Sequence, residues 1–419
     1  MFDRDLLNPM LTGSELYNAL QVIPKYDDSI RKMDKSVRLI ALSDLYSIYL
    51  PSKMSEEIYA KLYLSLIRSL NKKATINAIK QSNENYKSIR GMSYQGVIGG
   101  ADSYTIIGCS GIGKSTAISR AVSLISNKSF IELNGTKICP IIVAQCPFDS
   151  SIKGLMLEVL RIIDSILETK YYTNALRSHA TTDVLIGMVS QVSLNHVGLL
   201  IIDEIQHCAI SKNGRLFING ITQLINTSGI SICMIGTPEC TEFFKNKLQL
   251  ARRSMGLSYT PLTCDAYFQK LCRVIFDYQY TRQKAELTDT IMEWLYEHSA
   301  GIVSLVITLI HDAQEIAILN GTEQIELSTL NEAYEKRSSM LHSYISSGIK
   351  KLPQTGVMTK QKKHPILERI SAQNTGGYII QDLSICEIVE QSKRNGFNVV
   401  GALKQYCKIE EIANGEIIQ

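Results

Sequence analysis

A glycine-rich segment, Gly108–Thr116, has the residue types and the spacing that bind phosphate groups. It fits the pattern G-x-x-x-x-G-K-[ST] without a mismatch. Glycine backbones can bend so that successive N–H groups point inward at one anion. The segment therefore predicts a nucleoside triphosphate site, with contacts from Gly108, Cys109, Ser110, Gly111, Ile112, Gly113, Lys114, Ser115 and Thr116.

The last residues of this loop have distinct predicted roles. Lys114 can reach the β- and γ-phosphates, and the Ser115 hydroxyl can hold Mg²⁺. The apolar run before the loop, at 104–107, is typical of a buried strand, and 117–125 has the pattern of an amphipathic helix. The positive end of that helix would face the bound phosphates.

Two adjacent acids follow a second apolar run. The run at 199–202 reads as a buried strand, and Asp203 and Glu204 come directly after it. Downstream of a phosphate loop this is a Walker B pattern. Asp203 can complete the magnesium shell through water, and Glu204 can orient and deprotonate the water that attacks the γ-phosphate.

Two further segments could complete the chemistry. Thr237 follows the apolar strand at 230–235 and is the candidate sensor of the γ-phosphate; the alternative is an ordinary turn. Arg252 and Arg253 precede a short strand at 257–262, and one guanidinium could reach the nucleotide of a neighbouring subunit. A solvated surface pair is the alternative for the arginines.

Strands that alternate with helices imply an α/β fold, with a parallel sheet between layers of helices. The pattern divides the chain into an N-terminal helical region for partner docking (1–98), a nucleotide-binding core (99–264), a helical lid (265–348), and a basic linker with a C-terminal partner-binding tail (349–419).

Three local features are also predicted. We expect a helix to begin at Ser55, whose side chain would cap it. We expect a polar turn at 168–174, after a helix at 153–167. We expect no apolar run long enough to span a bilayer, because the run at 300–310 is short and interrupted.

The composition is that of an ordinary globular protein. The chain has 419 residues, of which 45% are hydrophobic and 20% charged, and this length favours two or more domains. Its ten cysteines are scattered without a C-x-x-C pair, which favours reduced core residues in the cytoplasm. Because the net charge is only +4, any surface that binds DNA must be local.

The order of these elements resembles that of an AAA+ P-loop ATPase. More narrowly, the sequence is similar to the TniB/TnsC transposition regulators at 145–155, 199–206, 234–239 and 249–253. The resemblance implies a bacterial protein that binds ATP and Mg²⁺ and forms rings or helical homo-oligomers on duplex DNA. It also implies a DDE transposase and a TniQ-type targeting protein as partners, and no membrane.

The resemblance places DNA contacts after the second strand of the core and after the next helix. In this chain these positions are Lys153 and Thr173, with Lys170 and Arg177 as lesser candidates. Lys153 stands near a predicted helix start, where contacts to phosphate are physically sensible. A solvated surface lysine is the alternative.

One departure from the family pattern concerns the lid. Many AAA+ lids place an arginine shortly after a glycine, but the segment 301–306 contains none, so turnover is expected to be slow. Three other functions stay open: a replication initiator or helicase loader of the same superfamily, a nucleotide-binding scaffold that hardly hydrolyses ATP, and a helicase, since 203–207 matches D-E-x-x-H.

Overall fold

The structure is a computed structural model and describes residues 6–74, 102–133, 135–207, 214–241 and 256–338. Its contacts divide the chain into two units, Met1–Leu352 and Pro353–Gln419, and the second unit lies wholly outside the described residues.

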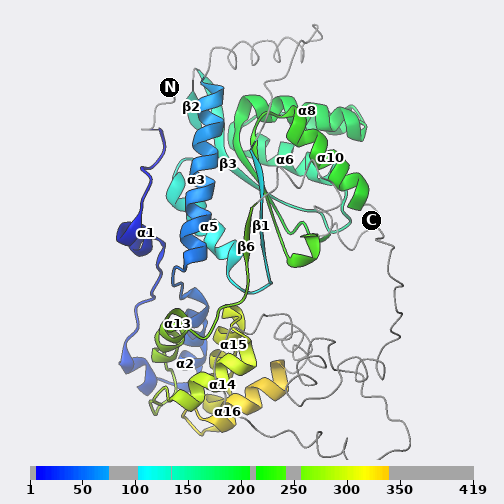
Figure 1. Ribbon diagram of the computed structural model, residues 1–419. Coiled ribbons are helices and arrows are strands. Elements are labelled where there is room, and N and C mark those ends of the chain that lie inside the picture. Colours follow the sequence, from blue (N-terminus) through cyan, green and yellow to red (C-terminus); the bar gives the residue numbers. More distant parts are fainter. Residues whose placement is uncertain (1–5, 75–101, 134, 208–213, 242–255, 339–419) are drawn as a thin grey trace, which may run out of the picture. The chain divides into compact units, whose positions relative to one another are not determined.

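A six-stranded sheet forms the centre of the core, in the order β2-β3-β4-β5-β1-β6 (Figure 1). All neighbouring strands are parallel except β2 and β3. In chain order the strands are β1 (Ser103–Gly108), β2 (Ile131–Leu133), β3 (Thr136–Gln145), β4 (Val197–Asp203), β5 (Ser231–Gly236) and β6 (Leu257–Tyr259).

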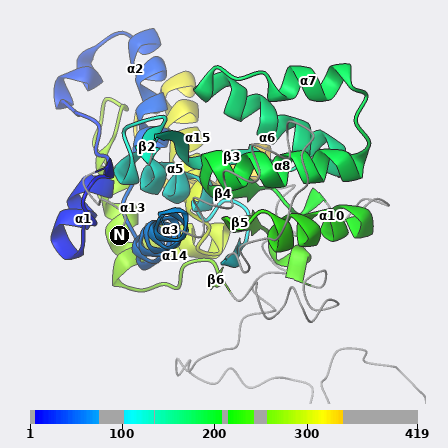
Figure 2. The ribbon, with the colours of Figure 1, turned by 90° about the horizontal axis from the view of Figure 1, so that it is seen from above.

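The central strands are buried on both faces, which is why they are continuous apolar runs. One face packs against α1 (Gly13–Leu20), α3 (Lys53–Lys73) and α5 (Lys114–Ile125). The other packs against α6 (Ile152–Leu167), α7 (Tyr171–Arg177), α8 (Thr182–His196) and α10 (Gly214–Thr227), as Figure 2 shows. The predicted α/β fold, a parallel sheet between layers of helices, is confirmed, with one antiparallel edge strand.

The start of α3 differs from the prediction. The helix begins at Lys53, and Ser52 occupies the capping position. The Ser55 hydroxyl accepts a hydrogen bond from the Ser52 N–H at 3.0 Å, so Ser55 closes a capping box from inside the helix. Both serines fit the local pattern, and the tertiary packing of the preceding segment selects the earlier start.

The predicted turn at 168–174 is also wrong in its second half, because α7 begins at Tyr171. The carboxylate of Asp164 accepts hydrogen bonds from the N–H groups of Tyr171 and Tyr172, each at 2.9 Å, and so holds the start of α7. Its partners are seven and eight residues away, a spacing that no helix pattern indicates.

The lid consists of α13 (Ala266–Asp277), α14 (Asp289–Ser299), α15 (Val303–Asn320) and α16 (Leu327–Ala333), followed by the π-helix η5 (Tyr334–Ser338). Within the described residues, α15 alone is long and apolar enough to cross a membrane by length and composition, which corrects the expectation that no segment is. Its side chains pack in the lid core, and more than half of the helix is buried.

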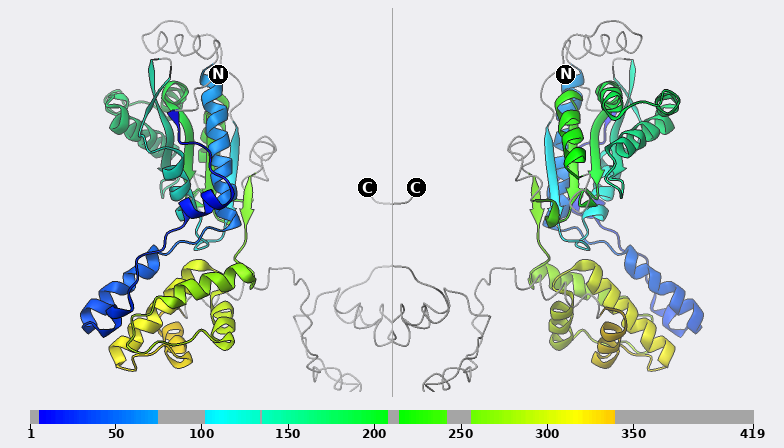
Figure 3. Two further views of the ribbon diagram at one scale, coloured as in Figure 1. Left: turned by 90° about the vertical axis from the view of Figure 1, so that its left-hand side faces the viewer. Right: turned by 90° about the vertical axis from the view of Figure 1, so that its right-hand side faces the viewer.

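Most of the segment between α1 and α3 packs against the lid. This segment forms η2 (Asp28–Lys32), α2 (Lys35–Ala41) and η3 (Leu42–Ser47). A further short 3-10 helix, η4 (Pro238–Cys240), follows β5 in the core. Arg38 on α2 is 1% exposed and holds Glu323 of the lid through two hydrogen bonds of 2.6 and 2.7 Å. In Figure 3, α2 (dark blue) lies beside the lid helices, whereas α3 lies along the sheet.

Candidate nucleotide-binding site

The phosphate loop joins the end of β1 to the start of α5. Gly113 caps α5 with a φ of 96°, a left-handed conformation that favours glycine. The Lys114 ammonium is buried and donates hydrogen bonds to the carbonyls of Gly108 and Cys109, at 2.6 and 2.8 Å. The backbone of the loop thus holds the Lys114 ammonium in place.

The two acids stand at the end of β4, which β5 separates from β1 in the sheet. The Ser115 hydroxyl lies 3.4 Å from Oδ2 of Asp203, and the Glu204 N–H donates to the other oxygen, Oδ1, at 2.8 Å. Glu204 has a φ of 59°, a strained conformation for a residue other than glycine. Gln206 donates a hydrogen bond from its side-chain amide to the Glu204 carboxylate and so orients it.

Burial shifts the pKa values of two charged side chains that line the cavity, Lys114 and Asp203. It lowers the pKa of Lys114, which the charge of Asp203 opposes. It raises the pKa of Asp203, which the hydrogen bond from the Glu204 N–H opposes. The charged forms of both side chains are therefore destabilised by desolvation, and an anionic phosphate or a bound cation would relieve this cost.

The donor set fits the predicted Mg²⁺. Ser115 and Asp203 supply a hydroxyl and a carboxylate oxygen, and Mg²⁺ takes oxygen ligands with the remaining positions filled by water and phosphate. The exposed Ser115 side chain leaves room for those further ligands.

Thr237 comes directly after β5 and lines the same cavity. Its hydroxyl donates to the Glu239 carboxylate at 2.5 Å, so its proton is directed at a residue that does not line the cavity. The oxygen keeps its capacity to accept a hydrogen bond. Thr237 therefore offers an acceptor to a water molecule in the cavity.

These residues surround one cavity of about 230 Å³ among the described residues. It brings together the predicted Lys114, Ser115, Thr116, Asp203, Glu204 and Thr237, with Ser110, Gly111 and Gly113 of the loop. Gln206, Gly236 and Ser304 also line it and were not predicted. Gln206 and Gly236 neighbour predicted residues. Ser304 comes from the lid segment 301–306, which stood out in the sequence only for its missing arginine.

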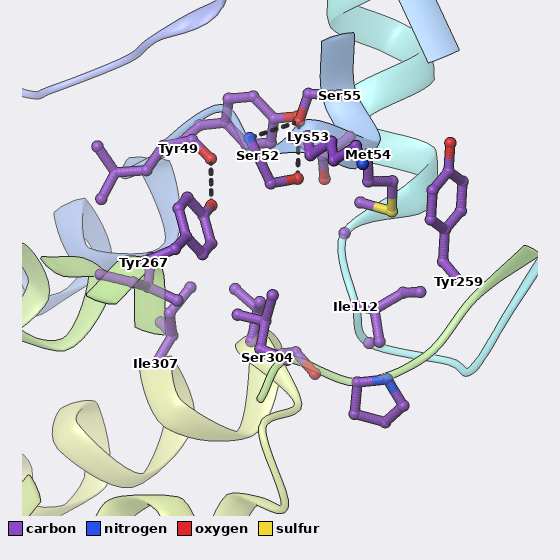
Figure 4. A pocket seen from close by; sticks show the side chains of 18 of the residues that line it. Tyr49, Ser52, Lys53, Met54, Ser55, Ile112, Tyr259, Tyr267, Ser304 and Ile307 are labelled. Atoms are coloured by element: carbon purple, nitrogen blue, oxygen red, sulfur yellow. Dashed lines mark hydrogen bonds between the residues drawn. The ribbon is translucent and has the colours of Figure 1, made fainter. Parts of the chain in front are cut away.

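A second, larger cleft of about 1180 Å³ adjoins the phosphate cavity. Its lining comes from the segment before α3, the phosphate loop, the chain after β6, and the lid. Figure 4 shows Tyr49, Tyr267 and Ile307 on one side, with Ile112 and Tyr259 opposite. Such a mostly apolar cleft beside a phosphate cavity is suited to a nucleoside.

Several predicted site residues lie elsewhere. Arg252 and Arg253 lie outside the described residues. Lys153 is exposed in the first turn of α6, and Lys170 is exposed beyond the end of that helix. A helix of 16 residues spans roughly 24 Å, so these two lysines do not form one cluster. Thr173 and Arg177 are exposed on α7.

A family model described as the bacterial TniB protein matches residues 99–258 of this chain. The matched range holds the phosphate loop, Asp203, Glu204 and Thr237, and it excludes the lid and the segment that packs on the lid. No curated protein shows a match to the sequence.

Three solved structures illustrate the likeness of the fold. The ORC1 protein of Aeropyrum pernix in complex with DNA is 15% identical over 78% of this chain and 81% of its own, with a TM-score of 0.41. Drosophila ORC bound to DNA is 11% identical over 96% and 83%, with a TM-score of 0.43. RuvB of Thermotoga maritima is 15% identical over 62% and 68%, with a TM-score of 0.32. Because these scores are low, the fold assignment rests on the strand order.

Proposed function

Because a family model of the bacterial TniB protein matches residues 99–258, we propose that this protein is an ATP-dependent, DNA-binding regulator of bacterial DNA transposition. It would assemble with ATP on target duplex DNA in the cytoplasm and recruit a DDE transposase, with a TniQ-type protein as targeting partner. The observation that carries the proposal is the cavity in which Lys114, Asp203 and Glu204 converge inside the matched range.

In this proposal the nucleotide spans the large cleft and the phosphate cavity. The adenosine lies in the large cleft and the phosphates lie in the small cavity, where the loop N–H groups and Lys114 neutralise their charge. Mg²⁺, held by Ser115 and Asp203, would neutralise further charge on the phosphates.

Hydrolysis follows from the position of Glu204. Its carboxylate accepts a proton from a water molecule while the water oxygen attacks the γ-phosphorus and the bond to the bridging oxygen breaks, giving ADP and phosphate. Gln206 orients the carboxylate, and the Thr237 oxygen accepts the second hydrogen of the water. Arg252 or Arg253 would stabilise the developing charge from a neighbouring protomer.

DNA contacts would come from α6 and α7. Lys153 stands exposed beside the loop that follows β3, and the same loop leaves Phe148 88% exposed. An aromatic residue so open to water is consistent with a surface that becomes covered on assembly. Thr173, with Lys170 and Arg177, would provide further backbone contacts.

The direct test is assembly in solution. We expect the wild type to form large oligomers on a duplex of arbitrary sequence with a non-hydrolysable ATP analogue, as seen by size-exclusion chromatography and negative-stain microscopy. Lys114→Ala is the control and should stay unassembled. Monomers alone would contradict the proposal, and assembly restricted to one DNA sequence would favour an initiator.

A further inference from the structure

The lid meets the phosphate loop through the first turn of α15. The Ser304 N–H donates a hydrogen bond of 3.0 Å to the Gly111 carbonyl. Gly111 has a φ of 81°, and a Cβ on it would lie 2.3 Å from Oγ of Ser304 and 2.9 Å from Cγ2 of Ile302. This close approach therefore requires glycine in the loop.

Ser304 stands at the junction of the two hollows. It lines both the nucleoside cleft and the phosphate cavity, together with Gly111, Gly113 and Thr116. Asp203, Glu204 and Thr237 line the phosphate cavity alone and so mark its far end. A nucleotide that spans both hollows passes Ser304 where its first phosphates follow the nucleoside.

We propose that Ser304 is the phosphate-binding residue of the lid and that it contacts the phosphates shared by ADP and ATP. This inference rests on the proposed nucleotide site. The serine hydroxyl donates to a phosphate oxygen while the Ser304 N–H holds the loop, so the lid closes on either nucleotide. A serine side chain is too short to reach the γ-phosphate at the far end, where a longer arginine could.

As a consequence, lid closure and recognition of the γ-phosphate depend on different residues. Closure of the lid depends on the presence of a nucleoside diphosphate, whereas recognition of the γ-phosphate is left to the residues around Asp203 and Thr237. The lid then contributes equally to the affinity for ADP and for ATP, and hydrolysis alone does not release it.

The test is a set of binding titrations with ADP, a non-hydrolysable ATP analogue and adenosine, on the full chain. Ser304→Ala should weaken ADP and the analogue by the same factor, about tenfold, because a hydrogen bond to a charged group is lost. Its affinity for adenosine should change less than twofold, and Ser304→Thr should restore phosphate-dependent binding.

Thr308→Ala is the matched control, since Thr308 lies one turn further along α15 and lines the cleft but not the phosphate cavity. Any effect of this variant should be common to all three ligands. A loss confined to the ATP analogue in Ser304→Ala, or no loss for either nucleotide, would overturn the inference. If the wild type binds adenosine nucleotides in none of the titrations, the proposed function itself fails.

Discussion

The two ends of the candidate nucleotide site are built in different ways. The phosphate end, about 230 Å³, is lined mainly by short stretches at the ends of strands. Within each stretch the lining residues are close together in the sequence. The nucleoside end, about 1180 Å³, is assembled from segments hundreds of residues apart. The difference teaches that chemistry in this fold is set locally, whereas the space for the base depends on tertiary packing.

The two ends of the site also belong to parts of the chain that pack against different elements, the sheet and the lid. The phosphate loop and the two acids sit on the sheet, and α3 is packed on that sheet. The residues just before α3 are tied to the lid by Arg38 and Glu323, and by the Tyr278 hydroxyl, which donates to the Pro24 carbonyl at 2.6 Å. The cleft is lined from both parts, with Ile112 of the phosphate loop on one side and Tyr267 and Ile307 of the lid on the other.

The largest expected effect comes from removing the cation at the phosphate end. Lys114→Ala should weaken ATP binding by at least about a hundredfold, because a buried charge that faces the phosphates is lost. Adenosine binding in the cleft should survive. Calorimetric titration with both ligands checks this, and equal losses for both would show that the two ends are not separable.

Glu204→Gln should lower the rate of ATP hydrolysis by about 10² to 10³-fold, because the amide cannot accept the proton of the attacking water. ATP binding and assembly on DNA should persist, since no contact with the phosphates is removed. Phosphate release gives the rate, and sedimentation with duplex DNA gives the assembly. Rapid disassembly of this variant would count against Glu204 as the base.

Gly111→Ala tests the connection between the ends. The added methyl group meets Ser304 and also strains a backbone with a φ of 81°, so the lid should be displaced from the loop. We expect nucleotide affinity to fall by roughly tenfold. Gly187→Ala is a suitable control, because no atom lies within 4 Å of the Cβ it would gain. An equal nucleotide affinity of the two variants would show that the contact between Gly111 and Ser304 does not contribute to binding.

Lys153→Ala should leave nucleotide binding alone and weaken DNA binding. The slope of log affinity against log salt should fall by about one, as expected when one phosphate contact is lost. Arg161→Ala is the matched control on the same helix, since the Arg161 charge is already paired with Glu158 at 2.6 Å. An equal change of slope in both variants would exclude a specific role for Lys153.

The smallest effect is expected at the nucleoside end. The Tyr259 hydroxyl donates to Glu57 of α3 at 2.9 Å and so ties β6 to that helix beside the cleft. Tyr259→Phe removes one partly exposed hydrogen bond, and the affinity for adenosine should fall by only about twofold. A tenfold loss of affinity would mean that adenosine binding in the cleft depends on this single hydrogen bond.

The sequence predicted that Lys114, Ser115 and Asp203 lie at strand ends, because the motifs follow apolar runs, and in the structure these residues line one cavity. Their roles toward a nucleotide stay predictions. The sequence missed Ser304 because the segment 301–306 stood out only for its missing arginine, and a serine gives no sign of a contact made across about two hundred positions to Gly111. The start of α7 was missed for a related reason, because Asp164 caps it from the preceding helix. The short strand β2 and the helix α10 were not predicted either.

The most direct test of the whole account is a structure of the protein with a non-hydrolysable ATP analogue and duplex DNA. The account predicts phosphates beside Lys114 and Asp203, the base in the cleft between α3 and the lid, and protomers joined around the duplex. An empty phosphate cavity, or a nucleotide bound away from the glycine loop, would contradict it.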